Sequence, residues 1–242
     1  MFRFYGKSTK SYLKELNQDC LLVNNIVSNN SPIKGSSKNE NILFAIADGV
    51  GGSKYGEIAS NYILQELAKN RNLLNHQLII NTIKNTHYYL IKNYSYNAQT
   101  VLSIVWIEKE KFTIYHIGDT RVYLITERNL IQLTNDHTYV QELVDKGIIS
   151  NIMKSRHPKK NIIPQSLGGN GELKIDIYNG LIEPGNKLLL TTDGIHDYVD
   201  DENIYKSIHK IKNLENNINN LTSSAIENNS KDDITGLVIY YQ

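Results

Sequence analysis

Aspartate residues at the ends of predicted strands are the side chains of this sequence best suited to chemistry. They are Asp19, Asp48, Asp119, Asp193 and Asp232. Carboxylates that gather at one edge of a sheet repel each other unless a cation neutralises them. Because no cysteine or histidine pair accompanies them, their oxygen atoms favour Mg²⁺ or Mn²⁺ over Zn²⁺. Two such ions, bridged by a shared carboxylate, can activate a water and hold a phosphoryl group during in-line attack.

Each aspartate taken alone also has a plainer interpretation. Asp48 and Asp193 are each followed by glycine, and an Asp-Gly pair after a strand is often only a turn. The glycine-rich stretch after Asp48 does not fit a nucleotide-binding loop. Lys54 precedes Tyr55 and stands where a dinucleotide motif needs its third glycine. A metal-binding turn, in which the Asp48 side chain and the Gly49 carbonyl face the ion, fits better.

Short apolar runs bounded by turn-forming or charged residues predict the strands that must position these aspartates. We expect strands at 20–27, 42–47, 100–107, 111–117, 121–126, 173–178, 187–192 and 235–241. Apolar residues at helical spacing predict helices at 54–70, 76–92, 138–147, 201–211 and 213–228. The third helix begins with a capping box, in which Thr138 and Gln141 bond each other's backbone. Adjacent strands interrupted by helix pairs indicate an α+β fold, with packed antiparallel sheets and helices outside, and 1–242 as a single domain.

The composition excludes several classes of protein. Lys and Arg total 26 against 25 for Asp and Glu, which argues against a nucleic-acid or membrane-surface binder. No apolar run approaches the ~20 residues of a membrane span, and the N-terminus has no run of signal-peptide length. The single cysteine, Cys20, excludes a disulfide framework, and we expect it to be buried. We therefore expect a soluble, cytoplasmic protein without nucleic-acid or membrane partners.

In order along nearly the whole chain, these motifs resemble the metal-dependent type 2C serine/threonine protein phosphatases (PPM family), in their compact bacterial form. The most distinctive segment is 44–52, FAIADGVGG. The others are 14–19 (KELNQD), 118–121 (GDTR), 133–138 (LTNDHT), 157–161 (HPKKN) through 167–168, 189–194 (LLTTDG) and 231–235 (KDDIT). The resemblance implies a sandwich of two antiparallel β-sheets flanked by α-helices. It also implies a mobile flap at about 144–170.

The resemblance further implies a metal-binding role for each aspartate that matches a motif. Asp48 would bridge both catalytic ions, with the Gly49 carbonyl on one of them. Asp193 and Asp232 would complete the shell of one ion. Asp19 would serve the other ion, directly or through a water.

A third ion and the substrate phosphate have implied ligands too. Asp119 would help to hold the third ion, and Lys14 stands where the family usually has an arginine that binds phosphate. Lysine keeps the charge but loses the bidentate fork of arginine. Two further departures are Val50, where many members have a histidine, and Asp233, which replaces a common asparagine and either adds charge or caps its loop. The implied catalytic residues are Asp48, Asp193, Asp232 and Lys14, with two or three Mn²⁺ or Mg²⁺ ions as cofactor.

Residues around these motifs have ordinary structural interpretations. Arg121 would anchor the Asp119 turn or pair locally, and His116 would be structural. Asp136 fits a turn or helix cap better than a metal ligand. The basic residues within 144–170 either belong to a solvated loop or steer phosphopeptides toward the site.

The first hypothesis is a cytoplasmic phosphoserine/phosphothreonine protein phosphatase that uses a metal-activated water and forms no phosphoenzyme. The resemblance implies phosphoproteins as partners, among them a cognate Ser/Thr kinase and its targets, and we expect a monomer. The alternative is a non-catalytic phosphoprotein-binding module of the same fold. Lys14 and Asp233 leave room for it, while the intact aspartates argue against it. A third hypothesis is hydrolysis of a small phosphorylated metabolite.

Overall fold

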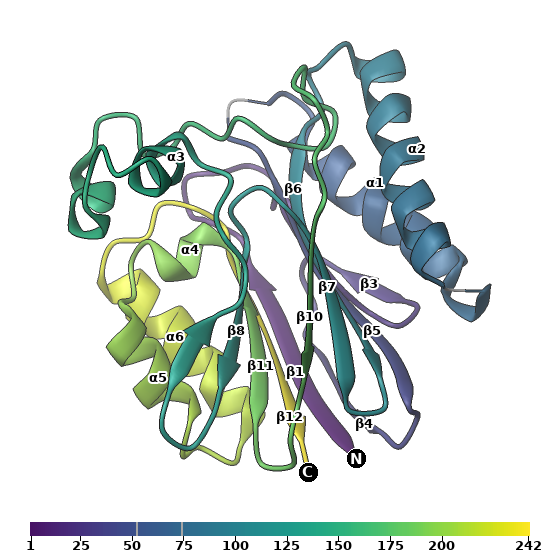
Figure 1. Cartoon of the computed structure of the whole chain (residues 1–242), viewed down its shortest axis with the longest axis vertical. Coiled ribbons are helices and arrows are strands. Elements are labelled where there is room, and N and C mark those ends of the chain that lie inside the picture. The colour runs from purple at the N-terminus through teal and green to yellow at the C-terminus, as the bar shows by residue number, and fades with distance from the viewer. Residues whose placement is uncertain (52, 74) are drawn as a thin grey trace.

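The computed structural model describes residues 1–51, 53–73 and 75–242, and its strands form two packed antiparallel sheets (Figure 1). The first sheet has the order β4 (Ile33–Ser37), β1 (Phe2–Thr9), β12 (Ile234–Tyr241), β11 (Lys187–Thr191), β8 (Arg121–Ile125), β9 (Leu130–Gln132). The second has the order β10 (Asp176–Leu181), β7 (Lys111–Ile117), β6 (Thr100–Glu108), β5 (Asn41–Gly49), β2 (Asp19–Val23), β3 (Ile26–Ser28). The predicted α+β sandwich is therefore confirmed.

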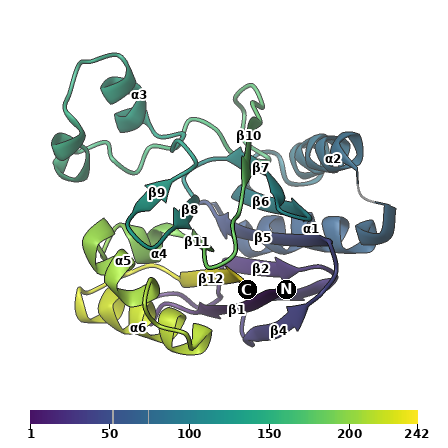
Figure 2. The same ribbon diagram turned by 60° about the horizontal axis from the view of Figure 1, so that its bottom comes forward.

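Helices cover the outer face of each sheet. The second sheet is covered by α1 (Gly56–Lys69) and α2 (His76–Tyr94), which are linked through the short η1 (Arg71–Leu73). The first sheet is covered by α4 (Asp193–His196), α5 (Asp201–Ile208) and α6 (Leu214–Glu227). A projecting segment with α3 (Tyr139–Asp145) and η2 (Asn151–Arg156) extends from one end of the sandwich (Figure 2). None of the described helices is long and apolar enough to cross a membrane.

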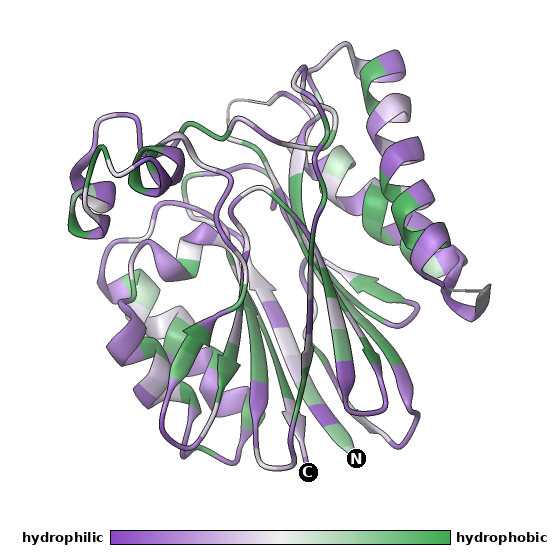
Figure 3. Cartoon of the chain, viewed as in Figure 1, coloured by the Kyte–Doolittle hydropathy of each residue, from purple (hydrophilic) through white to green (hydrophobic). Residues whose placement is uncertain are grey.

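Three apolar layers hold the sheets and helices together, and hydrophobic residues follow the strands between them (Figure 3). Strand β5 shows how the sequence specifies this. Phe44 and Ile46 face the opposite sheet, whereas Leu43 and Ala45 face the helices. Since both faces of β5 are covered, its sequence is a continuous apolar run instead of an alternating one. Each large side chain fully buried in these layers stabilises the fold by ~1.5–3 kcal/mol.

The chain ends lie side by side at the end of the sandwich away from the projecting segment (Figure 1). Strand β1 pairs with β12 from Phe2 opposite Tyr241 to Thr9 opposite Ile234. The backbones of Met1 and Gln242 exchange two hydrogen bonds of 2.8 Å. Strands β1 and β12 are therefore neighbours along their whole length.

Some predicted element boundaries are wrong. The expected strand 20–27 is a hairpin, because Asn24 takes a left-handed conformation (φ 56°) between β2 and β3. Strand β1 was not predicted, since its charged and polar residues obscure the alternation, and the strand predicted at 173–178 lies instead at Asp176–Leu181. The capping box of α3 is half formed. Thr138 Oγ1 accepts from the Gln141 amide at 3.2 Å, but the Gln141 side chain bonds Asp145 and Lys154 instead.

Candidate active site

The five predicted aspartates converge at the end of the sandwich opposite to the chain termini. Asp48 is the last residue but one of β5 and stands opposite Asp19, the first residue of β2, so their Cα atoms are ~4.5–5.5 Å apart. Asp119 follows β7, Asp193 follows β11 and Asp232 precedes β12. Each of Asp19, Asp193, Asp232 and Asp119 lies near enough to raise the pKa of Asp48. The structure thus brings together residues that are far apart in the sequence.

Burial and mutual repulsion raise the pKa of four of these carboxyl groups, Asp19, Asp48, Asp119 and Asp193. Asp19 is only 1% exposed, and burial together with the charges of Asp233 and Asp232 raises its pKa to about 7. Burial and the nearby Asp136 raise the pKa of Asp119 to about 7 as well. The pKa values of Asp48 and Asp193 are raised well above the ordinary value by burial and by the neighbouring carboxylates. A cation among these groups would remove the repulsion that causes the shifts.

The donor atoms fit a hard divalent cation. Among the described residues, the buried atoms Asp19 Oδ1 and Asp193 Oδ1 have no hydrogen-bond partner. Unpartnered buried carboxylate oxygens are costly, and a metal ion is one way of satisfying them. In the described part of the chain no group of three His, Cys, Asp or Glu side chains is already arranged to hold a metal ion. Mg²⁺ does not need such a group, because it commonly binds one or two carboxylates and keeps several waters.

Lys14 places a positive charge next to Asp232. Its Nζ atom donates to Asp232 Oδ1 and, at 3.2 Å, to Asp233 Oδ2. Burial disfavours the charged amine, but the bond to Asp232 and the surrounding carboxylates outweigh burial and raise the Lys14 pKa. Lys14 is therefore a permanent cation at the edge of the aspartate cluster. Asp233 is fully buried, and its carboxylate caps the loop that carries Lys14.

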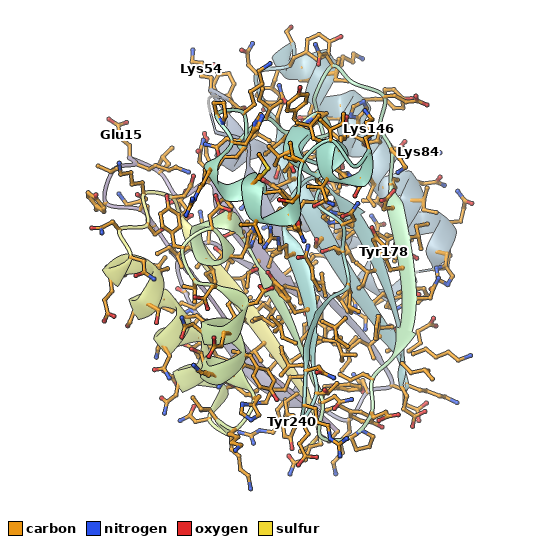
Figure 4. All side chains as sticks on the ribbon, turned by 60° about the vertical axis from the view of Figure 1, so that its left-hand side comes forward. Glu15, Lys54, Lys84, Lys146, Tyr178 and Tyr240 are labelled. Carbon is orange, nitrogen blue, oxygen red and sulfur yellow. The ribbon has the colours of Figure 1, made fainter. Side chains whose placement is uncertain are left out.

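A cleft of about 450 Å³ opens onto the aspartate cluster. Its lining includes Asp119, Asp193, Asp232, Val50, Gly51, Arg121, Asp136, Thr138, Val140, Asn151, Lys154, Lys160, Asn161, Ile163, His196 and Asp197. The projecting segment covers one side of the cleft. Lys160, which belongs to this segment, binds Asp197 at a distance of 2.8 Å. Figure 4 shows the labelled side chains of Glu15, Lys54 and Lys146 toward this end of the molecule, with Tyr240 at the opposite end. Gly52, part of the FAIADGVGG motif, lies outside the described residues.

Within the predicted flap, two basic residues lie at the cleft and the C-terminal end is anchored. The basic residues Lys154 and Lys160 line the cleft instead of pointing only into solvent. At the other end of the segment, Leu167 is fully buried and its backbone exchanges two hydrogen bonds with Thr100. The anchored part therefore begins before residue 170, and the mobility of the rest stays a prediction.

The contacts of the neighbouring residues are structural, but Asp136 is an ion-pair partner and not a helix cap, since Thr138 caps α3. Arg121 pairs with Asp136 through Nε and Nη2, with distances of 2.9 and 2.6 Å. This pair explains Asp136 without any metal. His116 is buried and bonds Ser103 Oγ at 2.9 Å, and burial lowers its pKa to about 4. His137 supports the Asp119 turn, because its Nδ1 accepts from the amide of Gly118 at 3.1 Å.

Two residues of the site were missed in the sequence. Asp197 lies near Asp119 and Asp193 and contributes to the raised pKa of each. Thr192 Oγ1 donates to Asp19 Oδ2 at 2.8 Å and so fixes that carboxylate. The spacing of Asp193 and Asp197 was an available signal, since residues four apart share one face of a helical turn. We had predicted only a strand and a turn there.

Comparison with known proteins identifies the family. The family model "Protein phosphatase 2C" matches residues 3–143, so the chain belongs to the protein phosphatase 2C family. Protein phosphatase PhpP of Streptococcus pneumoniae is 32% identical over 170 residues, which cover 65% of this chain and 68% of that protein. The solved structure of serine/threonine phosphatase Stp1 from Staphylococcus aureus has a TM-score of 0.87 and 26% identity, over 100% of this chain and 96% of that one.

The comparisons also confirm the enzyme class and the fold. The relatives are serine/threonine phosphatases, which are hydrolases. The catalytic domain of serine/threonine protein phosphatase PstP, solved with two manganese ions, has the same fold with a TM-score of 0.80 and 23% identity, over 99% of both chains. The resemblance stated from the motifs is therefore confirmed, whereas the role of each individual aspartate stays a prediction.

Proposed function

We propose that this chain, acting as a single domain, hydrolyses phosphoserine and phosphothreonine in proteins with two or three Mn²⁺ or Mg²⁺ ions. One observation carries the proposal. Five aspartates gather beside a lysine cation, and three of them, Asp119, Asp193 and Asp232, line the cleft. Two of the buried carboxylate oxygen atoms have no partner among the described residues. Family membership gives this arrangement its chemical meaning. The ion count, the preferred metal and the ligand assignment are parts of the proposal.

The proposed ligands are those that the resemblance to the family implies, and the positions of these residues support them. Asp48, between Asp19 and the other aspartates, would be shared by two ions, together with the Gly49 carbonyl. Asp193 and Asp232 would complete one shell, and Asp119 would contribute to a third ion. When bound, the ions would supply an activated water and neutralise the charge of the transferred phosphoryl group.

The side chains of this chain have their own tasks in the proposed reaction. Lys14 would bind a phosphate oxygen and orient the phosphoryl group as a point charge. Val50 lines the cleft and offers no proton, so the leaving oxygen would be protonated from solvent. Cys20, at 1% exposure, is closed off from the cleft and its pKa is raised to about 12 by burial, which makes it unsuitable as a nucleophile. These features favour direct hydrolysis without a phosphoenzyme.

The open cleft suits a phosphorylated side chain on a protein segment. The projecting segment that borders the cleft exposes Ile152 and Met153. A protein substrate could cover these apolar side chains, whereas a small metabolite would leave them exposed. We therefore propose phosphoproteins as substrates, with a cognate Ser/Thr kinase and its targets as partners in the cytoplasm. A monomeric state stays a prediction.

The test is phosphate release from a phosphothreonine peptide by purified protein with Mn²⁺, with Mg²⁺ and with EDTA. We expect metal-dependent turnover. Asp193→Ala should reduce it by at least a hundredfold and weaken Mn²⁺ binding in calorimetry, because an ion loses one of its few protein ligands. The matched control is Asp200→Asn, since Asp200 only caps α5 through the amide of Asn203.

The same assay separates the alternatives. A folded protein that binds Mn²⁺ and phosphopeptide but releases no phosphate would support the non-catalytic binding module and contradict the proposal. Faster turnover of small phosphate esters than of peptides would instead indicate a metabolite phosphatase.

A further inference from the structure

Lys14 and Asp233, two positions at which this chain departs from the usual pattern of its family, touch each other. Lys14 Nζ lies 3.2 Å from Asp233 Oδ2. The carboxylate is fully buried, and the lysine side chain is 22% exposed. Asp233, in the protein interior, thus contacts Lys14, which is the only cation that contacts Asp232 in the described part of the chain.

Both carboxylate oxygen atoms of Asp233 accept hydrogen bonds. Its Oδ1 accepts from the amide of Ser11 at 2.7 Å, and its Oδ2 accepts from the amide of Gln18 at 2.9 Å and from Lys14 Nζ. An asparagine has one acceptor oxygen and a donor nitrogen, so it could not accept hydrogen bonds both from Ser11 and from Gln18 and Lys14. The contacts therefore require a carboxylate at this position.

These bonds fix both ends of the loop at 10–18, which connects β1 to β2. The pairing of β1 with β12 explains why this loop lies next to Asp233. Thr9, the last residue of β1, lies opposite Ile234, which directly follows Asp233. Between its fixed ends the loop is exposed, with Tyr12 at 77% and Leu13 at 59%. Packing alone therefore contributes little to the position of Lys14.

We propose that Asp233 is a positioning residue that holds Lys14 beside Asp232, which lines the cleft, so that Lys14 meets the substrate phosphate. The inference rests on the proposed phosphatase function, in which Lys14 binds phosphate. Asp233 does not touch the substrate in this scheme. Its charge also acts on Asp19, a proposed metal ligand, and at saturating Mn²⁺ its remaining effect on phosphate binding passes through Lys14. The lysine and the buried carboxylate act as a matched pair.

A double-mutant cycle tests the proposal, with Lys14→Gln, Asp233→Asn and the double variant at saturating Mn²⁺. Each single variant should raise the KM for a phosphothreonine peptide about tenfold, the worth of one charged hydrogen bond, while kcat changes little. The double variant should be no worse than Lys14→Gln, because with Mn²⁺ saturating the site the contact with Lys14 is the remaining route from Asp233 to the phosphate. Asp200→Asn is the control for the loss of an acidic side chain.

KM effects that multiply in the double variant would overturn the proposal. The same double-mutant cycle can be measured without turnover, by comparing the affinity of each Mn²⁺-loaded variant for inorganic phosphate in calorimetry. An inactive wild type whose phosphate binding still shows the coupling would refute the proposed function and support the positioning role. If Asp233→Asn does not fold, Asp233→Glu serves instead, since it keeps the charge but moves it by one methylene.

Discussion

Arg121 and Asp136 form a buried ion pair next to the aspartate cluster, and its role is structural. Their side chains are 15% and 4% exposed. The Arg121 charge holds the pKa of Asp136 below its ordinary value, although burial acts in the opposite direction. Gln132 Nε2 also donates to Asp136 Oδ1, at 2.9 Å. The pair links β8 to the segment that follows β9.

Asp136→Asn should lower the free energy of unfolding by about 3–5 kcal/mol, because it leaves the Arg121 charge buried without its counter-ion. Urea unfolding of the metal-free protein measures the loss. Asp200→Asn, which keeps a good helix cap, should change stability by less than about 0.5 kcal/mol. A loss below about 1 kcal/mol for Asp136→Asn would show that solvent reaches Arg121.

The start of α1 depends on a close backbone approach at the end of β5. A Cβ atom added at Gly49 would lie 2.6 Å from the carbonyl carbon of Gly56, the first residue of α1. Gly51, two residues later, has no atom of the described residues within 4 Å of the corresponding position. The two glycines of one motif therefore have different reasons to be glycine.

Gly49→Ala should destabilise the protein by about 2 kcal/mol or more, since α1 must move away from β5 or the backbone must distort. Gly51→Ala is the matched control and should leave the melting temperature within about 2 °C. Thermal unfolding followed by circular dichroism compares them. Equal melting temperatures for the two variants would mean that α1 does not pack on Gly49 as described.

The strands that the sequence predicts well are those buried on both faces. ILFAIA of β5 and KLLLT of β11 are continuous apolar runs that only a covered strand explains. Strand β1 was missed because Arg3, Lys7 and Ser8 break its apolar pattern. Its place depends on pairing with β12, more than 200 residues away, which local periodicity does not reveal.

The aspartates were predictable as a set, because each follows or precedes a strand. Their chemistry was not fixed by spacing alone, since Asp48 and Asp193 each also fit a turn. The order of several motifs along the chain favoured the metal-site interpretation over the turn interpretation. The contact of Lys14 with Asp233 depends on the three-dimensional arrangement of segments more than 200 residues apart, and no local pattern contained it, whereas Asp197 could have been found from its spacing to Asp193.

The aspartate cluster makes the stability of the whole molecule depend on pH and on divalent cations together. Asp19 and Asp119 have pKa values raised to about 7 from an ordinary value near 3.8. Between these values the native state binds more protons than the unfolded state. This contribution to stability is therefore full below about pH 4 and is lost as the pH rises through about 7.

Added Mn²⁺ should replace those protons, so the rise in melting temperature that it causes relative to EDTA should grow from pH 5.5 to pH 8. His116, whose pKa is lowered to about 4, acts in the opposite sense, since its contribution is lost as the pH falls below 6.5. It affects both samples equally and cancels in the difference. Thermal scans at matched ionic strength measure the effect, and a difference that stays constant over this range would contradict it.

The adjacent chain ends decide how this protein would respond to mechanical force. Phe2 lies opposite Tyr241, and their rings stack with centroids 4.5 Å apart. In an antiparallel pair the interstrand hydrogen bonds run perpendicular to the strands. A load applied between the two ends would therefore act along these bonds and break them one after another. The molecule should peel open from β1 and β12 at low force, at the end remote from the cleft.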